Sequence, residues 1–397
     1  MDKEQIGIPK LRFPGFTDPW EQRRLGDYLS IPTKEPITDI NELKLMTLKL
    51  NLEGITLSAN RETLKLGATK YYKRHEGQLL YGKQNFFHGS IALIPKEAEG
   101  YATSGDVPAL DISNVNSKYL VDYISRPSYF KAKEALATGT GSKRIHEKTL
   151  LNFKIAVPSL EEQNVISDFI TNYTNLIALH QRKLEHLKQQ KNGLLQKMFP
   201  KNGESVPDVR FPGFTDPWEQ RKLGDFGKVA MNKRIFKNQT SEKGDVPFYK
   251  IGTFGGIADS YISHELFEEY KLKYPYPRKG DLLISASGSI GRVIEYSGKD
   301  EYFQDSNIVW LDHDNRLDNS FLKQFYNIIK WQGLEGSTIK RLYNKNILAT
   351  KIDVPSISEQ LRIGDFFQQF DSLIALYQRK LEHLELLKKG LLQQMFV

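Results

Sequence analysis

The 397-residue sequence predicts an α+β protein with two globular domains separated by two long antiparallel coiled-coil helices, related by an internal duplication with pseudo-two-fold symmetry. Three observations predict this architecture: a sixteen-residue phrase that occurs twice, a long helical pattern that occurs twice, and a different strand-rich body after each phrase. The length alone favours two or three domains of about 100 to 200 residues each.

The repeated phrase opens each half of the chain. It reads RFPGFTDPWEQRRLGD at 12–27 and RFPGFTDPWEQRKLGD at 210–225, where the single change is Arg24 to Lys222. Fifteen identities in sixteen positions are far beyond chance, so the two halves have a common origin.

The bodies that follow the two phrases resemble each other only faintly. Residues 76–112 can be laid on 279–313, because both segments consist of short apolar runs broken by Gly, Ser and Asn. Such runs predict strands joined by turns. Apolar residues three and four apart predict helices over 128–139 and 319–333. Each body is therefore expected to be a small mixed domain that contains a sheet.

A second repeat predicts the long helices. LIALHQRKLEHLKQQKNGLLQKMF at 176–199 and LIALYQRKLEHLELLKKGLLQQMF at 373–396 differ at six of twenty-four positions, and apolar residues alternate steps of four and three, as in a coiled coil. Each helix of some 33 residues would be roughly 50 Å long. Lys191 and Lys388 interrupt the seam, and His180 is predicted to be a tolerated seam residue. The predicted seam consists of Ile166, Ile170, Tyr173, Ile177, Leu184, Leu187, Leu194, Met198, Ile363, Phe367, Phe370, Ile374, Tyr377, Leu381, Leu384, Leu391 and Met395.

Helix starts and a linker complete the organisation. Val-Pro-Ser precedes each helix and acidic residues follow it, which is typical of a helix N-terminus, and PKNGESVP at 200–207 predicts a linker. Two equivalent halves tend to be related by a pseudo-two-fold axis, and such an axis perpendicular to the helices makes them antiparallel. The expected segments are a first globular domain at 1–155, a first spacer helix with the start of the linker at 156–200, a second globular domain at 201–352 and a second spacer helix at 353–397.

Composition narrows the class of protein. Fifty-six Lys and Arg against forty-eight Asp and Glu leave a formal charge of +8, which mildly favours a polyanionic partner such as nucleic acid. The sequence has no cysteine, which excludes disulfides and thiolate catalysis and favours the cytoplasm. The N-terminal residues lack the apolar core of a signal peptide, and no stretch approaches the roughly twenty apolar residues of a membrane span.

Catalytic signatures are missing from the sequence. It has neither the Asn/Asp-Pro-Pro-aromatic run nor the Gly-rich cofactor loop of an adenine methyltransferase. GTGSK at 139–143 lacks the spacing of a phosphate-binding loop. SASGSIG lacks the G-x-S-x-G pattern of a nucleophile elbow. Asp259, Glu269 and Lys271 have the order of a Mg²⁺-binding nuclease triplet, which arises often by chance. The eight His lack metal-ligand spacing. We therefore expect no catalytic residue, no metal and no cofactor.

Several motifs follow one another in a fixed order, and most of them recur in both halves. They are WEQR(R/K)LGD, a Gly-rich segment such as GDLLISASGSIGR followed by YFQDSN, a late GxxxKR before VPS, and EQ with a long helix that ends in GLLQxMF. From about Leu11 onward, this arrangement resembles the DNA-specificity subunit of a type I restriction-modification system. The resemblance implies two target recognition domains, each reading half of a split, asymmetric site in double-stranded DNA. It also implies recruitment of two methyltransferase subunits and, through them, restriction subunits, with no membrane and no small-molecule substrate.

The candidate DNA contacts lie in loops that follow the predicted strands. Lys and Arg position a protein on phosphates, whereas amide, hydroxyl, Arg and His groups read base edges. The candidates in the first body are Tyr81, Lys83, Gln84, Asn85, His88, Ser90 and Ser104. Those in the second are Ser285, Ser287, Ser289, Arg292, Gln304, Asp305, Ser306 and Asn307. The recurring Lys143, Arg144, Lys340 and Arg341 are candidate phosphate contacts. For each residue, the alternative is a turn, strand-edge or solvated group without contact to DNA.

A second function remains open at this level. The long seam and the modest charge also fit a coiled-coil adaptor whose end domains bind proteins rather than DNA, and the salt dependence of a gel shift would separate the two. Outward helix residues with Trp20 and Trp218 are candidate surfaces for the methyltransferase subunits. The alternative is that both Trp side chains pack their own domain against the helices.

Overall fold

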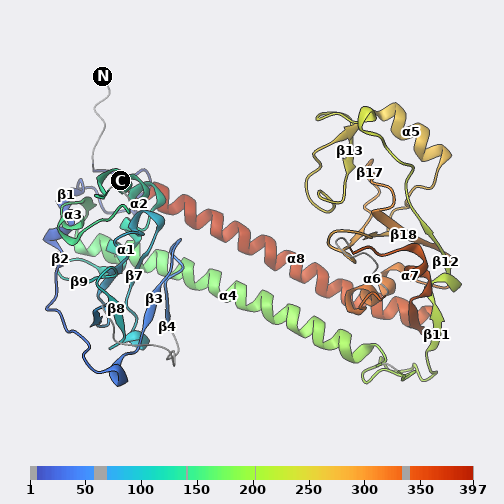
Figure 1. Ribbon diagram of the computed structural model, residues 1–397, viewed down its shortest axis with the longest axis horizontal. Helices are drawn as coiled ribbons and strands as arrows, with labels where there is room; N and C mark the ends of the chain where they lie inside the picture. The colour runs from blue at the N-terminus through green and yellow to red at the C-terminus, as the bar shows by residue number, and fades with distance from the viewer. Residues whose placement is uncertain (1–6, 58–68, 140–141, 202, 333–339, 397) are drawn as a thin grey trace. The chain divides into compact units, whose positions relative to one another are not determined.

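The computed structural model describes residues 7–57, 69–139, 142–201, 203–332 and 340–396 (Figure 1). The chain divides into two compact units, unit 1 with Met1–Gln181 and Lys380–Val397, and unit 2 with Arg182–Arg379. Both unit boundaries fall inside long helices. The predicted segments set these helices apart from the globular domains, whereas the compact units divide each helix between them.

The described part of unit 1 contains short strands, three short α-helices and parts of the long helices α4 (Leu160–Met198) and α8 (Ile357–Gln394). Its strands are β1 (Glu21–Arg24), β2 (Leu29–Ser30), β3 (Met46–Leu48), β4 (Ile55–Leu57), β5 (Tyr71–Lys73), β6 (Leu79–Tyr81), β7 (Ile91–Leu93), β8 (Ala102–Ser104), β9 (Ala109–Ile112) and β10 (Lys154–Val157). Its helices are α1 (Ser117–Ile124), α2 (Pro127–Ala132), α3 (Glu147–Leu151) and the first part of α4 (Leu160–Met198).

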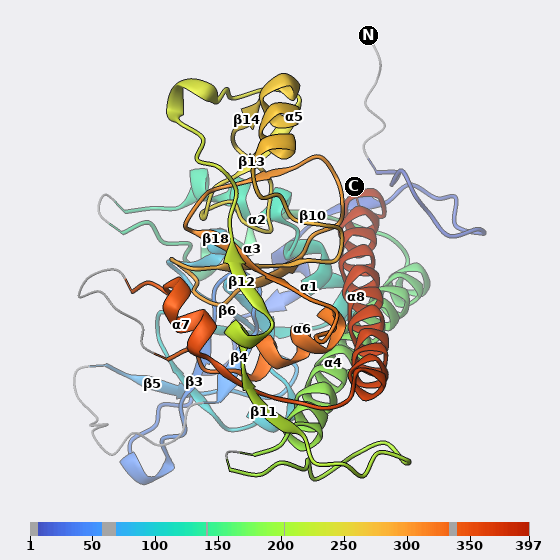
Figure 2. The ribbon, with the colours of Figure 1, turned by 90° about the vertical axis from the view of Figure 1, so that its right-hand side faces the viewer.

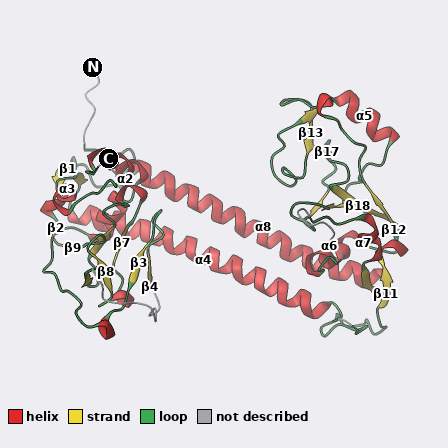
Figure 3. Ribbon diagram, in the orientation of Figure 1, coloured by secondary structure: helices red, strands yellow, loops and turns green. Residues whose placement is uncertain are grey.

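Unit 2 repeats this composition with a different set of peripheral elements. Its strands are β11 (Glu219–Lys222), β12 (Gly227–Ala230), β13 (Val246–Tyr249), β14 (Tyr261–Ile262), β15 (Leu282–Ser285), β16 (Val293–Glu295), β17 (Tyr302–Phe303), β18 (Ile308–His313) and β19 (Lys351–Val354). Its helices are α5 (His264–Lys273), α6 (Asn319–Ile328), α7 (Asn344–Ala349) and the first part of α8 (Ile357–Gln394). Figure 3 shows that loops join most of these short strands.

The central sheets of the two units have the same topology. Unit 1 has the strand order β2-β9-β6-β7 and unit 2 the order β12-β18-β15-β16, with every neighbour antiparallel. Figure 2 views unit 2 with β12 and β18 toward the reader and α7 beside β12. Each repeated phrase adds a small sheet, β1 with β10 and β11 with β19. The predicted mixed domains are confirmed, although the predicted helix over 128–139 is an α-helix only to Ala132 and continues as a 3₁₀ helix to Leu136.

The sequence around each long helix explains where it begins and ends. Ser159 Oγ accepts a hydrogen bond from the backbone N of Glu162 at 3.3 Å, and Ser356 Oγ does the same for Glu359 at 3.4 Å. These bonds satisfy backbone donors that have no partner inside the helix, and acidic side chains stabilise the same helix end. Pro200, directly after Phe199, cannot continue α4.

The two long helices are antiparallel. In the core of unit 1, Ile166 and Ile170 near the start of α4 share a cluster with Met395 and Phe396 at the end of α8. In the core of unit 2, Leu195 and Met198 near the end of α4 share a cluster with residues near the start of α8. The predicted fold class is therefore confirmed.

Burial along the helices follows the predicted seam. Every predicted seam residue is buried or half-buried. Lys191, which interrupts the apolar pattern, is buried and places its Nζ 2.6 Å from Asp371 Oδ1. A partner carboxylate thus compensates the charge at that seam position. His180 and Lys388 are half-buried. No helix of the described residues is long and apolar enough to span a membrane.

The repeated phrase attaches the body of each unit to both long helices. Trp20 packs edge-on against Phe396, and Trp218 packs in the same way against Phe199. The backbone N of Leu11 donates to Gln394 O, and Val209 N donates to Lys197 O, both at 2.9 Å. Each phrase therefore holds the end of the helix that belongs, by sequence, to the other half of the duplication.

Two ion pairs fix the same phrase to the helix starts. Arg12 donates through Nε and Nη2 to the two carboxylate oxygens of Glu162 at 2.7 and 2.8 Å, and Arg210 donates to Glu359 at 2.7 Å twice. The glutamate side chains are only 1% exposed in both pairs. The hydrogen bonds that Arg12 donates to Glu162 raise the pKa of Arg12, and those that Arg210 donates to Glu359 raise the pKa of Arg210. Such two-point contacts fix orientation as well as distance.

Candidate nucleic-acid interface

In each unit, the same backbone hydrogen bonds join three chain segments. The segments are 83–84, 106 and 144–145 in unit 1, and 286–287, 307 and 341–342 in unit 2. In unit 1, Lys83 N donates to Asp106 O at 2.9 Å and Ile145 N donates to Lys83 O at 2.8 Å. In unit 2, Ala286 N donates to Asn307 O at 2.7 Å and Leu342 N donates to Ala286 O at 2.8 Å. These bonds make four positions structurally equivalent. Lys83 corresponds to Ala286, Gln84 to Ser287, Asp106 to Asn307 and Arg144 to Arg341.

The site of unit 1 consists of paired charges. Lys83 Nζ lies 2.9 Å from Glu147 Oε1, and Arg144 Nη2 lies 3.5 Å from Asp106 Oδ2. With its amide oxygen turned toward the guanidinium, Gln84 accepts from Arg144 Nη2 at 2.6 Å and from Nε at 3.1 Å. Burial would raise the pKa of Glu147, but hydrogen bonds from Lys83 and from the backbone hold that pKa below its ordinary value. The site of unit 1 therefore contains both hydrogen-bond donors, Lys83 and Arg144, and hydrogen-bond acceptors, the carboxylates and the oxygen of Gln84.

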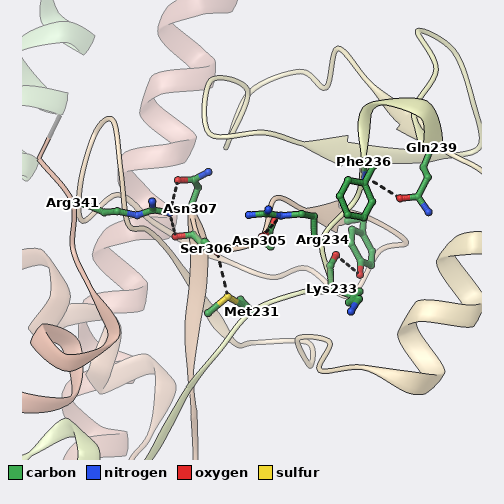
Figure 4. Close-up of polar contacts among 10 residues, drawn as sticks. Met231, Lys233, Arg234, Phe236, Gln239, Asp305, Ser306, Asn307 and Arg341 are labelled. Atoms are coloured by element: carbon green, nitrogen blue, oxygen red, sulfur yellow. Dashed lines mark hydrogen bonds and ion pairs between the residues drawn. The ribbon is translucent and has the colours of Figure 1, made fainter. Parts of the chain in front are cut away.

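The site of unit 2 contains fewer carboxylates (Figure 4). Arg341 Nη2 donates to Ser306 O at 3.1 Å and to Asn307 Oδ1 at 3.2 Å. Ser287 Oγ donates to the same Asn307 oxygen at 2.8 Å. Asp305 pairs with Arg234, whose Nε lies 2.9 Å from Asp305 Oδ2. The guanidinium of Arg341 is therefore held by neutral oxygens.

The structure brings together fewer than half of the predicted contacts. Gln84 and Arg144 in unit 1, and Ser287, Ser306, Asn307 and Arg341 in unit 2, lie in these two sites. Asn85, directly after Gln84, and His88 are exposed, and Ser104 is half-buried in β8. Lys143 is exposed and pairs with Glu134 at 2.8 Å, whereas Lys340 is exposed at the edge of the second site.

Several predicted contacts have buried side chains, and their contact with DNA stays a prediction. Tyr81 and Ser285 are 0% and 1% exposed, and Ser90 is 2% exposed. The hydroxyl of Tyr81 donates to Ile145 O, and this bond holds the segment that carries Arg144 in place. Ser285 Oγ donates to Ser289 O and accepts from Arg292 N, so it closes the turn of the Gly-rich segment. These three residues follow the same polar pattern as the surface loops, but their positions in the strands or turns direct them inward.

Other predicted contacts have structural partners but keep an accessible side. Gln304 Oε1 accepts from Ile251 N at 2.9 Å, which ties it to the preceding loop. Arg292 is exposed and donates to Gly255 O at 3.2 Å, and Ser289 is exposed in the same turn. Lys83 is half-buried in its pair with Glu147. Contact between these residues and DNA stays a prediction.

Both tryptophans are absent from the surface. Trp20 is 5% exposed and Trp218 is 3% exposed, each among the aromatic rings that hold the helix ends. The expectation that they form part of a docking surface is wrong. The alternative, that they pack their own domain against the helices, is what the structure shows.

The sequence analysis missed Asp106 and Arg234. Asp106 was hidden in a turn, SGDVP, that reads as a connection between strands. Its equivalence to Asn307 follows when 76–112 is laid on 279–313 so that Ile112 matches His313, which would have identified it. Arg234 lies far from Asp305 in sequence, so no local signal marked their pairing.

The triplet considered for a nuclease is dispersed. Asp259 pairs with Lys250, Glu269 with Lys273, and Lys271 with Asp300, at 2.8, 2.9 and 3.3 Å. Within the described ranges, no group of three or more His, Asp or Glu side chains is arranged to hold a metal ion. Residues 140–141 of GTGSK and 336–339 of its counterpart lie outside the described residues.

Comparison with known proteins identifies the family. The family model for the type I restriction modification DNA specificity domain matches residues 17–189 and again 215–386. A Haemophilus influenzae protein assigned as a type I restriction enzyme specificity subunit is 40% identical over 260 residues, which is 65% of this chain and 65% of that protein. The MjaVIII type I restriction enzyme specificity subunit of Methanocaldococcus jannaschii is 24% identical over 96% of this chain and 92% of its own length.

The fold agrees with this match. The crystal structure of a type I restriction-modification S subunit from M. genitalium covers 98% of this chain and 99% of its own, with a TM-score of 0.62 at 16% identity. The adaptor alternative has no support among these similar proteins. Because the family model matches both halves, over most of the sequence, the chain belongs to the family of type I restriction-modification DNA specificity proteins.

Proposed function

We propose that this chain is a non-catalytic specificity subunit that reads a split, asymmetric DNA target, with one word read by each unit. The supporting observation is the pair of equivalent sites. The same backbone hydrogen bonds hold three segments together in both units, yet the side chains presented there differ at Lys83 and Ala286, Gln84 and Ser287, and Asp106 and Asn307. A constant frame with different hydrogen-bonding groups is what reading two different words requires.

The experiment is methylome sequencing of cells that express the full chain with its methyltransferase and restriction subunits. The expected result is one asymmetric motif in which two short words are separated by a gap of fixed length. Exchange of the side chains at the site of one unit should change one word and leave the gap unchanged. A single uninterrupted motif would contradict the proposal.

The long helices supply matched surfaces for the recruited subunits, which we propose are two copies of a methyltransferase subunit. Leu176 and Leu179 of α4 are 38% and 56% exposed, and their counterparts Leu373 and Leu376 of α8 are 37% and 54% exposed. Exposed leucines at the same two positions of both repeats fit two copies of one apolar partner surface. On α8 the pair lines a shallow groove with Asp365, Gln368, Gln369 and Ser372.

Substitution of Leu179 and Leu376 by Glu tests this recruitment. The doubly substituted chain should fold normally and lose the methyltransferase subunits on co-purification. Leu386 is the matched control, because it is 68% exposed on α8 but its counterpart in α4 is Gln189. Leu386→Gln should leave assembly unchanged. If the double variant still binds two methyltransferase subunits, these leucines are not the docking surface.

A further inference from the structure

Arg341 is a positioned cation whose charge is not neutralised by a described carboxylate. Its side chain is half-buried and is tethered through Nη2 to Ser306 O and Asn307 Oδ1. Asp305, in the same turn, is occupied by Arg234. In the part of the chain that the structure describes, Arg341 forms no ion pair, and neither Nε nor Nη1 has a hydrogen-bond partner. The guanidinium therefore keeps two donor groups available in a fixed position.

Asn307 adds a donor beside this guanidinium. Its Oδ1 already accepts from Ser287 Oγ and from Arg341 Nη2, which uses both lone pairs and orients the amide. The amide nitrogen then faces away from these donors, and none of the described residues accepts from it. An asparagine that reads adenine uses both its oxygen and its nitrogen. Since the oxygen is engaged, Asn307 can act only as a donor.

The turn that carries Asn307 is held in an unusual conformation. Ser306 has a φ of 60°, in the left-handed region that residues other than glycine rarely adopt. Ser306 Oγ donates to Asp305 Oδ2 at 3.3 Å and contacts the sulfur of Met231 at 3.8 Å, and this backbone geometry directs Ser306 O toward Arg341 (Figure 4). Surrounding contacts thus maintain a strained residue at the point where the arginine is anchored.

We propose that Arg341 and Asn307 form a donor-only reader that recognises a guanine in the word bound by unit 2. Guanine presents two acceptors, O6 and N7, in the major groove, and arginine is its commonest specific partner. Adenine and cytosine each present an amino donor there, which would face the donors of this site. This inference rests on the proposed DNA target but adds a base and two residues to it.

Unit 1 provides an internal contrast. Asp106 occupies the position of Asn307, so the equivalent Arg144 faces a carboxylate at 3.5 Å and the oxygen of Gln84. A carboxylate can accept from the amino group of cytosine or adenine, and it reduces the attraction between the arginine and guanine. The guanine-reading property is therefore assigned to unit 2 and not to unit 1.

The test uses the full chain in complex with its methyltransferase subunits. Binding is measured for duplexes in which each base pair of the target is replaced in turn, with the wild type, Arg341→Ala and Arg341→Lys. Both variants should lose about 10- to 100-fold of the discrimination at one guanine in the word of unit 2, with the other word unaffected. Arg144→Ala is the control and should leave that guanine position unchanged.

A modified base links the residue to the atom that it contacts. Replacing the identified guanine by 7-deazaguanine removes N7, so it should weaken binding of the wild type but add little to the loss in Arg341→Ala. Asn307→Asp is a second variant that keeps the side-chain shape and introduces the carboxylate of unit 1. It should reduce the preference for guanine at the same position.

Other outcomes overturn the assignment. Uniform weakening on every sequence, with the salt dependence reduced by about one ion, would mean that Arg341 contacts a phosphate. Unchanged discrimination at every position would mean that Arg341 does not contact DNA. The wild-type complex tests the proposed function separately, because an unsplit target would contradict that function whether or not Arg341 reads a guanine.

Discussion

Arg144 and Arg341 occupy equivalent positions in the two units, but Arg144 faces a carboxylate whereas Arg341 is held by neutral oxygens. In unit 1 the nearby cations Lys83, Lys143 and Arg144 pair with three carboxylates, those of Glu147, Glu134 and Asp106. In unit 2, Ala286 stands in the place of Lys83, Asp305 pairs with Arg234, and Arg341 is held by oxygens of Ser306 and Asn307.

The scaffold shows the reverse pattern. The ion pairs Arg12 with Glu162 and Arg210 with Glu359, and the buried Trp20 and Trp218, are nearly superposable in their contacts. The duplication has therefore preserved the groups that hold each unit to the long helices and has changed the groups at the proposed reading site. Such a division allows a word to change without altering assembly.

The largest expected effect tests whether the scaffold is energetically the same in both units. Leu187 and Leu384 are equivalent seam residues, 5% and 8% exposed. Leu187→Ala and Leu384→Ala should each lower the free energy of unfolding by about 2 to 5 kcal/mol, because each leaves a cavity. Denaturant unfolding of the full chain is the measurement. Leu179→Ala and Leu376→Ala are exposed controls and should change it by less than about 0.5 kcal/mol. Costs that differ widely between the two seam positions would break the equivalence.

A second prediction concerns a place where the units differ in a half-buried charge. Asn116 caps α1 and Asp318 caps α6, and six residues after each cap lie Asp122 and Gln324. Burial raises the pKa of Asp122 to about 6, partly offset by Lys388 and Lys118. Because this pKa is higher in the folded state, the charged form destabilises unit 1, and stability is lost as the pH rises from about 4 through 6.

Asp122→Asn removes that dependence and makes unit 1 resemble unit 2. The variant should be more stable than the wild type by up to about 3 kcal/mol at pH 7 and nearly equal to it below pH 4. Thermal unfolding from pH 4 to pH 8 measures the difference. Gln324→Glu is the reverse substitution in unit 2 and should destabilise the chain at neutral pH. A difference that does not change with pH would contradict the assignment to Asp122.

The third prediction concerns the two ion pairs of the repeated phrase. Glu162→Gln and Glu359→Gln each remove a charged two-point contact, so each should cost about 2 to 3 kcal/mol of unfolding free energy. Hydrogen exchange should report faster opening of residues 12–20 in the first variant and of 210–218 in the second. Glu21→Gln is the control, because Glu21 pairs with Arg23 on the exposed surface. Equal exchange in both phrases for either variant would mean that the pairs do not act locally.

The smallest expected effect is on DNA discrimination. Asp106→Asn gives unit 1 the amide that unit 2 has at Asn307. We expect it to release Arg144 from its carboxylate and to shift the preferred base at one position of the first word toward guanine, by about 1 to 3 kcal/mol. Methylome sequencing of cells that express the variant complex measures the shift. Glu134→Gln, which removes a neighbouring exposed carboxylate, should leave both words unchanged. An altered second word would contradict the assignment of one word to each unit.

Much of the fold could be predicted because its signals are local and repeated. Alternating steps of three and four placed both long helices, and Pro, Ser and Glu marked their starts. Elements with weak local preference were less predictable. The segment at 128–139 changes from α-helix to 3₁₀ helix after Ala132. The helix predicted over 319–333 ends earlier, at Ile328.

The candidate site was only partly predictable, for a different reason. Polarity selected Asn307 and Ser90 equally, but Asn307 is half-buried beside Arg341, whereas Ser90 is buried directly before β7. Side-chain direction depends on register and on the turn that follows each strand, which composition does not specify. Trp20 and Trp218 illustrate the same limit, since a repeated aromatic residue fits both a binding surface and a core.

The sequence by itself determined the duplication, the two long helices and the mixed character of both units, because each depends on spacing along the chain. The antiparallel arrangement of the helices was predicted from the symmetry expected of two equivalent halves. Only the tertiary structure decided which charges meet. The contacts between Arg341 and Asn307 and between Arg144 and Asp106, and the attachment of each repeated phrase to the helix end of the other half, join residues far apart in sequence. Such contacts depend on how the segments pack, and a hydrogen bond or ion pair forms only where packing brings donor and acceptor within about 3 Å.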